Sequence, residues 1–167
     1  MVLTVAGILL IATALLFYEK KYGDLEPQIG LPKAVEQKRQ AIFKAATAGD
    51  YEALTAEADP SLNYSFGGPH EKGFVGFLKL SEQTEGQSAL DIIPRLLELP
   101  YAYQANIYVW PNVFYKAPNE WKENDIELMK KLVSLDQIEK FREFGGYVYY
   151  RLGITKEGNW VFYIAGD

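Results

Sequence analysis

The sequence predicts an α+β fold: a single N-terminal transmembrane helix, then a helix-first domain on an antiparallel sheet. Three observations predict it. Residues 2–18 carry no charge and no proline. Helical spacing of apolar residues dominates the first half of the remaining chain, whereas alternating strand patterns concentrate near its end. The β-α-β rhythm that is typical of parallel sheets is missing from the pattern.

The uncharged stretch 2–18 would span roughly 25 Å as a helix at about 1.5 Å per residue. A bilayer core of about 30 Å can just be crossed by a segment of that length. We therefore expect residues 1–22 to form a membrane anchor. Its apolar and aromatic residues are Leu3, Val5, Ile8, Leu9, Leu10, Ile11, Leu15, Leu16, Phe17 and Tyr18.

Two alternatives to the anchor stay open. One is a cleaved signal peptide, for which Ala12-Thr13-Ala14 offers a small-x-small site although no charge precedes it. The other is a buried helix of a soluble domain. Lys20 and Lys21 favour a cytoplasmic domain by the positive-inside rule. The lack of cysteine suits an exported protein. We expect a single-pass protein of the cell membrane whose domain is extracytoplasmic (periplasmic).

Residues 23–32 are rich in glycine and proline, which is typical of a linker that is extended and mobile or laid along a partner. The remaining residues, 33–167, are enough for one globular domain with a core of its own. The net charge is −5. Because a nucleic-acid binder needs a basic face, we expect no nucleic acid among the partners.

Two helices are expected at the start of the domain. Residues 33–48 repeat apolar side chains at helical spacing and stop at Gly49. Asp50 is a good N-cap for a second, short helix, which Asp59-Pro60 should end. Alternation then predicts a short strand over residues 62–66.

The middle of the chain alternates between helices and loops. Residues 73–80 allow one or two helical turns, and residues 81–87 read as a polar loop. An interior proline costs a helix about 3 kcal/mol. The next helix is therefore expected to start near Asp91, which leaves Pro94 in its first turn.

Strands concentrate in the last part of the chain. Residues 105–110 alternate as a strand does, and Asn124 and Ser134 are N-caps for two short helices. A hairpin is expected from residues 147–154 and 160–165. Both of its faces are apolar, which predicts a sheet buried on both sides or covered by a partner.

No motif indicates catalysis. His70 is the only histidine and the chain has no cysteine, so a metal site would be short of ligands. We expect His70 to be a solvated loop residue. Residues 65–68 (Ser-Phe-Gly-Gly) lack the lysine of a phosphate-binding loop, and no Gly-x-Ser-x-Gly elbow is present.

Carboxylates could also carry chemistry, as in glycosidases. The candidates are Asp50, Asp59, Asp91 and Glu98. Their spacing selects no pair, and Asp50 and Asp91 already suit helix caps. We therefore expect a protein that is not an enzyme and that holds no cofactor and no metal.

Aromatic residues crowd into positions 101–121, among prolines. They are Tyr101, Tyr103, Tyr108, Trp110, Phe114, Tyr115 and Trp121. Such a cluster can form a rigid surface that contacts a partner. Packing in the core is the alternative, because Tyr108 and Trp110 alternate with apolar neighbours on the expected strand.

Three patterns together resemble a family of uncharacterised bacterial domains, over roughly residues 33–167. They are Gly49 to Leu54 followed by Tyr64-Ser65-Phe66-Gly67-Gly68, the strand end Tyr108-Val109-Trp110-Pro111, and the closing run from Gly158 to Asp167. That resemblance implies no known activity and supplies no functional residue. A looser similarity to the NTF2-like fold, also called SnoaL-like or cystatin-like, implies helices packed into a curved antiparallel sheet.

We expect a non-catalytic, single-pass membrane-anchored accessory or scaffold subunit of a larger membrane protein complex. Its partners would be other membrane protein subunits and the lipid bilayer. The alternative is a membrane-anchored NTF2-like domain that binds a small apolar or sugar ligand in a deep aromatic cavity. A third hypothesis is an enzyme that pairs His70 with a carboxylate.

Overall fold

The computed structural model describes residues 25–64 and 71–166. The strands of its sheet are β1 (Ala58–Asn63), β2 (Ala102–Gln104), β3 (Ile107–Trp110), β4 (Arg151–Thr155) and β5 (Trp160–Ile164). The helices are α2 (Lys33–Thr47), α3 (Tyr51–Ala56), α4 (Gly73–Glu85), α5 (Ala89–Leu97), α6 (Glu123–Met129) and α7 (Leu135–Phe144). Two 3-10 turns, η1 (Asn112–Tyr115) and η2 (Pro118–Glu120), follow β3.

The fold is α+β, but its sheet is mixed and not antiparallel as predicted. The strand order is β1-β5-β4-β3-β2, and β1 pairs with β5 in parallel while the other pairs are antiparallel. The physical reason is the connection. β1 and β5 are separated by helices and by the other strands, so no hairpin turn forces them to run in opposite directions.

The predicted transmembrane helix, and with it the predicted single-pass membrane localisation, also needs correction. In the part of the chain that the structure describes, no helix has the length and apolar character needed to cross a membrane. α2 has 15 residues and carries charges along its length, whereas a span needs about 20 apolar residues. The proposed anchor residues, Leu3 to Tyr18, lie outside the described residues.

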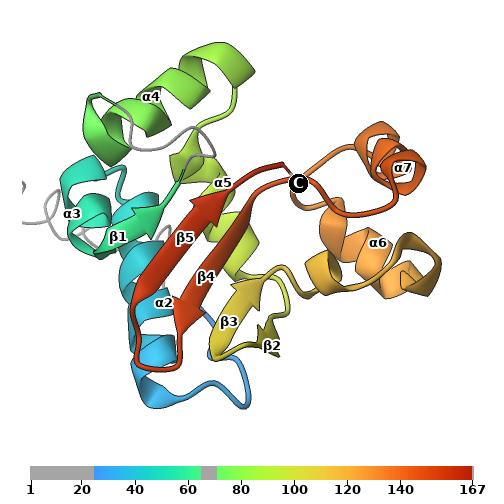
Figure 1. Ribbon diagram of the computed structural model, residues 1–167, viewed down its shortest axis with the longest axis horizontal. Helices are drawn as coiled ribbons and strands as arrows, with labels where there is room; N and C mark the ends of the chain where they lie inside the picture. The colour runs from blue at the N-terminus through green and yellow to red at the C-terminus, as the bar shows by residue number, and fades with distance from the viewer. Residues whose placement is uncertain (1–24, 65–70, 167) are drawn as a thin grey trace, which may run out of the picture.

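The main core lies between one face of the sheet and the pair α2 and α5 (Figure 1). Inward-pointing side chains of adjacent strands meet there, as in the pairs Tyr108–Ile154 and Leu152–Tyr163. The rings of Tyr150 and Tyr163 stack with centroids 4.9 Å apart. Aromatic side chains therefore fill much of the space between the two layers.

The other face of the sheet carries apolar residues as well. Val109 of β3 pairs with Gly153 of β4, which pairs with Phe162 of β5. Ile164 follows Phe162 by two residues on β5 and therefore lies on the same face. A Cβ on Gly153 would lie 2.2 Å from Cε1 of Phe162, so the Phe162 ring lies directly over the glycine. Only a residue without a side chain allows the ring to cover the sheet here.

Residues 25–32 lie against α2 and α5 and are fixed by side-chain amides. Gln40 accepts a hydrogen bond from the Leu25 N–H at 3.0 Å and donates one to the Leu25 carbonyl. Gln28 accepts from the indole N–H of Trp110 at 3.0 Å. This segment therefore contacts its own domain, in the region where the sequence indicates a linker.

A second, smaller core joins η1, α6 and α7 beside the sheet (Figure 1). Its buried residues are Val113, Trp121, Met129, Ile138, Phe141 and Tyr147. Asp125 stabilises its edge by accepting from the Lys116 ammonium at 2.7 Å and from the Lys122 N–H at 3.0 Å. Burial alone would raise the pKa of Asp125, but these hydrogen bonds and charges lower it overall.

The contact of Gly153 with Phe162 predicts a steric penalty. Gly153→Ala should lower the free energy of unfolding by about 1–3 kcal/mol, as overpacking does, in a urea titration. Gly146→Ala is the matched control, because a Cβ there meets no atom within 4 Å. Adding Phe162→Ala to Gly153→Ala should recover part of the loss. Equal stability of the two alanine variants would contradict the close contact.

The lowered pKa of Asp125 predicts a stability contribution that depends on pH. The contribution is fully present above the unfolded pKa of about 4 and is lost as pH falls through the lower folded pKa. At pH 7, Asp125→Asn should cost about 1–2 kcal/mol of unfolding free energy for the weakened charge-assisted bonds. The cost should shrink toward pH 3 in urea titrations. A cost for Asp125→Asn that stays constant with pH would contradict the linkage.

Candidate functional site

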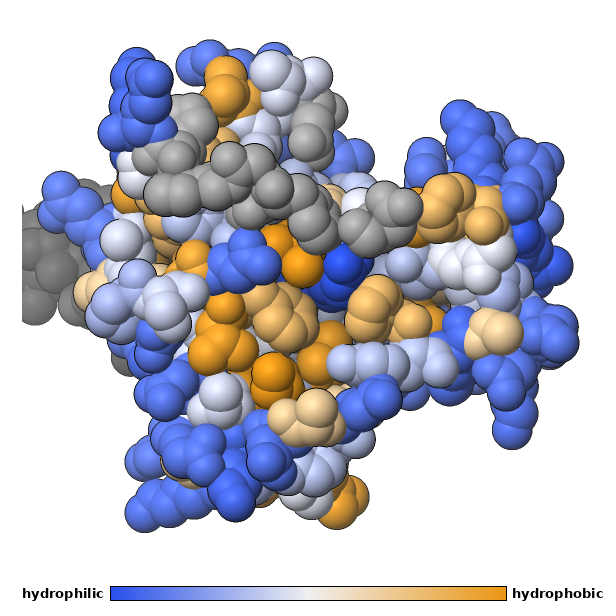
Figure 2. Space-filling model, viewed as in Figure 1, coloured by the Kyte–Doolittle hydropathy of each residue, from blue (hydrophilic) through white to orange (hydrophobic). Residues whose placement is uncertain are grey.

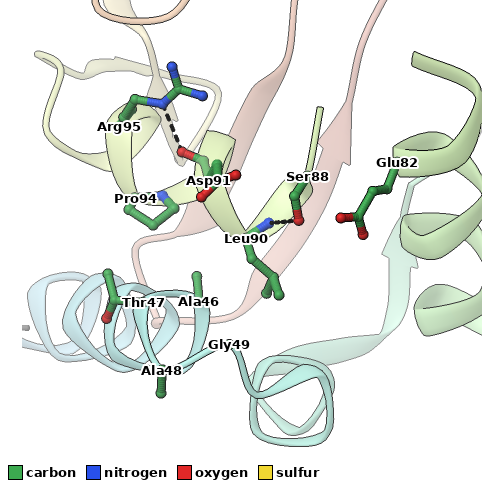
Figure 3. A pocket seen from close by; sticks show the side chains of 10 residues that line it. All are labelled: Ala46, Thr47, Ala48, Gly49, Glu82, Ser88, Leu90, Asp91, Pro94 and Arg95. Atoms are coloured by element: carbon green, nitrogen blue, oxygen red, sulfur yellow. Dashed lines mark hydrogen bonds between the residues drawn. The ribbon is translucent and has the colours of Figure 1, made fainter. Parts of the chain in front are cut away.

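A groove of about 710 Å³ lies where α2, α4 and α5 meet (Figure 3). Its lining residues are Ala46, Thr47, Ala48, Gly49, Glu82, Ser88, Leu90, Asp91, Pro94 and Arg95. The sequence sets this geometry locally. α2 ends at the groove, and the Ser88 hydroxyl caps α5 by accepting from the Leu90 N–H at 3.3 Å.

The charges of this groove are mainly negative. Glu82 and Asp91 line it, and the C-terminal carbonyls of α2 add partial negative charge. The Arg95 guanidinium is bound to backbone carbonyls of Asp91 (2.9 Å) and Lys131 (3.2 Å). The groove therefore suits hydrogen-bond donors and cations better than anions.

Tyr51 lies at the edge of the groove and reports on its electrostatics. Its hydroxyl donates to the Glu82 carboxylate at 2.9 Å, and the Lys79 ammonium lies 5.2 Å from the centre of its ring. Burial, followed by the hydrogen bond to Glu82, raises the pKa of Tyr51. Tyr51 therefore stays a neutral donor at physiological pH.

Chemistry-bearing groups do not converge in the described structure. Among residues 25–64 and 71–166, no group of three His, Cys, Asp or Glu side chains is placed to hold a metal ion. His70 and the Ser65–Gly68 loop lie outside the described residues. Of the carboxylates considered from the sequence, Asp50 caps α3 through the N–H groups of Glu52 and Ala53.

The seven aromatic residues predicted to contact a partner separate into three places. Tyr101, Tyr103, Tyr108 and Trp110 gather at the β2–β3 edge, with ring centroids 4.5–5.9 Å apart. Phe114 and Tyr115 lie together on η1, and Trp121 belongs to the second core. Tyr108, Trp110 and Trp121 are buried, whereas Tyr103 and Tyr115 are 50% and 43% exposed. The structure thus leaves two of these rings largely open to a partner.

A broader apolar surface lies on the sheet face that points away from α2 and α5. Figure 2 shows hydrophobic side chains gathered over β3, β4 and β5 on this face, with hydrophilic residues around them. By register, Ile107, Val109, Phe162 and Ile164 belong to it, and we call these four residues the open-face patch. Ile107 and Phe162 are half-buried, whereas Val109 and Ile164 are buried, so Ile107 and Phe162 supply the accessible part of this patch.

Comparison with known proteins gives no relative: no family model, no curated protein and no solved structure matches this chain. The resemblances to a bacterial domain family and to the NTF2-like fold stay predictions. The assignment of function therefore depends on the surfaces of the chain itself.

Three buried charged residues, Arg39, Asp125 and Arg151, were not predicted from the sequence. Arg39 is 1% exposed, and it lies on the apolar side of α2 together with Val35, Ile42 and Ala46. A charged residue at a core position of a helical repeat is the signal that could have identified it.

The link between Tyr51 and Glu82 predicts a measurable titration. Glu82→Gln should lower the pKa of Tyr51 relative to the parent protein, because deprotonation would no longer place two negative charges side by side. NMR of ring-labelled tyrosine across alkaline pH measures this. Glu127→Gln, on the distant helix α6, should leave the titration unchanged. If Glu82→Gln left the pKa of Tyr51 unchanged, the result would contradict the negative electrostatic character that we assign to the groove.

Proposed function

We propose that this domain is a non-catalytic binding subunit that holds a partner protein on the open-face patch. The single observation that carries the proposal is a sheet that described helices cover on one face and whose outward positions on β3 and β5 are nevertheless all apolar, with Arg151 and Thr155 of β4 beside them. Antiparallel sheets with one solvated face normally alternate apolar and polar side chains. Here the outward positions of β3 and β5 hold Ile107, Val109, Phe162 and Ile164.

The patch has the features of an interaction surface. Contiguous apolar surface with a polar rim marks protein contact sites on many domains. The Phe162 ring, held over Gly153, supplies a flat aromatic anchor whose position is already fixed. Such preorganised aromatic side chains carry much of the energy of known interfaces. The partner would present apolar side chains to the strands.

The ligand-binding alternative finds less support in the described core. The side chains of Trp110, Trp160 and Tyr163 are fully buried there. The ring centroids of Phe74 and Trp160 lie 5.4 Å apart, in an edge-to-face contact. Rings packed in this way occupy the interior that a deep aromatic pocket would need. We therefore place binding on the outside of the sheet.

The proposal predicts position-specific cross-linking to another protein. A photo-reactive phenylalanine analogue at position 162 of the tagged full-length protein should cross-link to one reproducible partner, identified by mass spectrometry. The same analogue at position 135 is the control, because Leu135 is 50% exposed on α7, away from the patch. Binding is then measured with the purified partner.

Affinity for that partner should depend on the patch. Ile107→Glu and Phe162→Glu should each weaken it by roughly thirtyfold, as loss of a hot-spot contact of about 2 kcal/mol does. Leu135→Glu should change the affinity for the partner less than threefold, because Leu135 lies outside the patch and no contact of the interface is lost. Circular dichroism and urea titration confirm that each variant is folded. Cross-links that form equally from position 135, or only to a second copy of this chain, would overturn the proposal.

A further inference from the structure

A second candidate site lies beneath residues 25–28, apart from the open-face patch. A cavity of about 380 Å³ opens there between this segment, α2 and the end of α5. Its lining residues are Leu25, Glu26, Pro27, Gln28, Arg39, Phe43, Glu98 and Lys131. The wall is partly apolar, because Leu25 and Phe43 are buried side chains.

Arg39 is the central polar group of this cavity. Its Nε donates to the Leu97 carbonyl at 3.0 Å. Its Nη1 donates to the Glu26 carbonyl at 3.1 Å and to both carboxylate oxygens of Glu36, at 2.9 and 3.0 Å. Within residues 25–64 and 71–166, no acceptor lies within hydrogen-bond reach of Nη2.

A buried guanidinium with an unused N–H pair favours an anionic ligand. Arg39 is 1% exposed as a residue, but its Nη2 is not one of the buried side-chain atoms without a partner, so this N–H pair is the part of the guanidinium that solvent or a ligand can reach. Burial lowers the pKa of Arg39, although the charge and hydrogen bond of Glu36 and the charge of Glu98 raise it. The group still stays protonated, because arginine does not lose its proton in proteins. A planar carboxylate matches the geometry of such a donor.

The other charged residues of the cavity restrict the ligand further. Lys131, Glu26 and Glu98 also line it and are exposed, so their charged ends can reach a ligand at its mouth. A simple anion would meet two carboxylates, and a simple cation would meet Arg39 and Lys131. A ligand that carries both charges satisfies both sets.

We propose that this cavity binds a free α-amino acid with an apolar side chain. Its carboxylate lies against Nη2 of Arg39 and the Lys131 ammonium, and its ammonium group faces Glu26 and Glu98. Its side chain packs against Leu25 and Phe43.

The test uses L-leucine and two analogues of the same skeleton on the full-length protein. One analogue, 4-methylpentanoate, lacks the ammonium group, and the other, isoamylamine, lacks the carboxylate. Titrations followed by ¹⁵N NMR should show saturable shifts near Leu25, Arg39 and Lys131 with leucine. Each analogue should bind at least about tenfold more weakly, as loss of a charge-assisted hydrogen bond implies.

Variants separate this site from an effect on folding. Lys131→Met changes an exposed residue and should weaken leucine binding about tenfold. Lys130→Met is the matched control, because Lys130 is paired with Glu127 on α6 and does not line the cavity. Arg39→Lys keeps the charge but removes the planar fork, and should abolish the saturable shifts while the unfolding transition persists.

Three outcomes would overturn the proposal. The first is no saturation by leucine up to tens of millimolar. The second is equal binding of leucine and either analogue, and the third is equal affinity of the Lys131→Met and Lys130→Met variants. None of these readouts involves the open-face patch, so the two proposals fail or stand separately.

Discussion

The buried guanidinium of Arg39 is the interaction on which the arrangement of the helix layer depends. It joins α2 to the last turn of α5 through the Leu97 carbonyl and to the 25–32 segment through the Glu26 carbonyl. Burying a charge is costly unless it is paired and hydrogen-bonded, and Glu36 supplies the pairing. Without the guanidinium, two backbone carbonyls and a carboxylate would lose a donor together. The relative position of the two central helices is therefore specified by polar contacts as well as by packing.

That helix layer covers one face of the sheet, and the second core explains why no described helix packs across the other face. η1, α6 and α7 bury their apolar side chains among themselves, around Trp121 and Phe141, beside the sheet and not across it. Arg151 bridges the two regions, with its guanidinium 4.4 Å from the centre of the Phe114 ring. Because these helices bury their apolar side chains in the second core, they leave Ile107 and Phe162 of the sheet partly exposed. The open-face patch thus follows from the way apolar area is divided between two cores.

Local signals predicted the elements that local physics determines. α2 and the final hairpin were expected, and the structure confirms Asp50 and Ser134 as helix caps. Elements that tertiary contacts decide were missed. Pro60 lies inside β1, where an edge strand tolerates it, and Pro94 lies inside α5 because burial of that helix outweighs the lost hydrogen bond. For the candidate surfaces, aromatic density could not separate a core ring such as Trp110 from an exposed one. That distinction requires knowing which face of the sheet the helices cover.

The parallel pairing of β1 with β5 has a consequence for the order of events during synthesis. β5 lies between β1 and β4, yet it is made after every other described element. Until it emerges from the ribosome, β1 has no neighbour, and the apolar sides of α2 and α5 have only part of the sheet to cover. Contacts between distant parts of a chain form late and slow folding. The apolar sides of α2 and α5 therefore stay incompletely covered from the synthesis of α5 until β5 has been made.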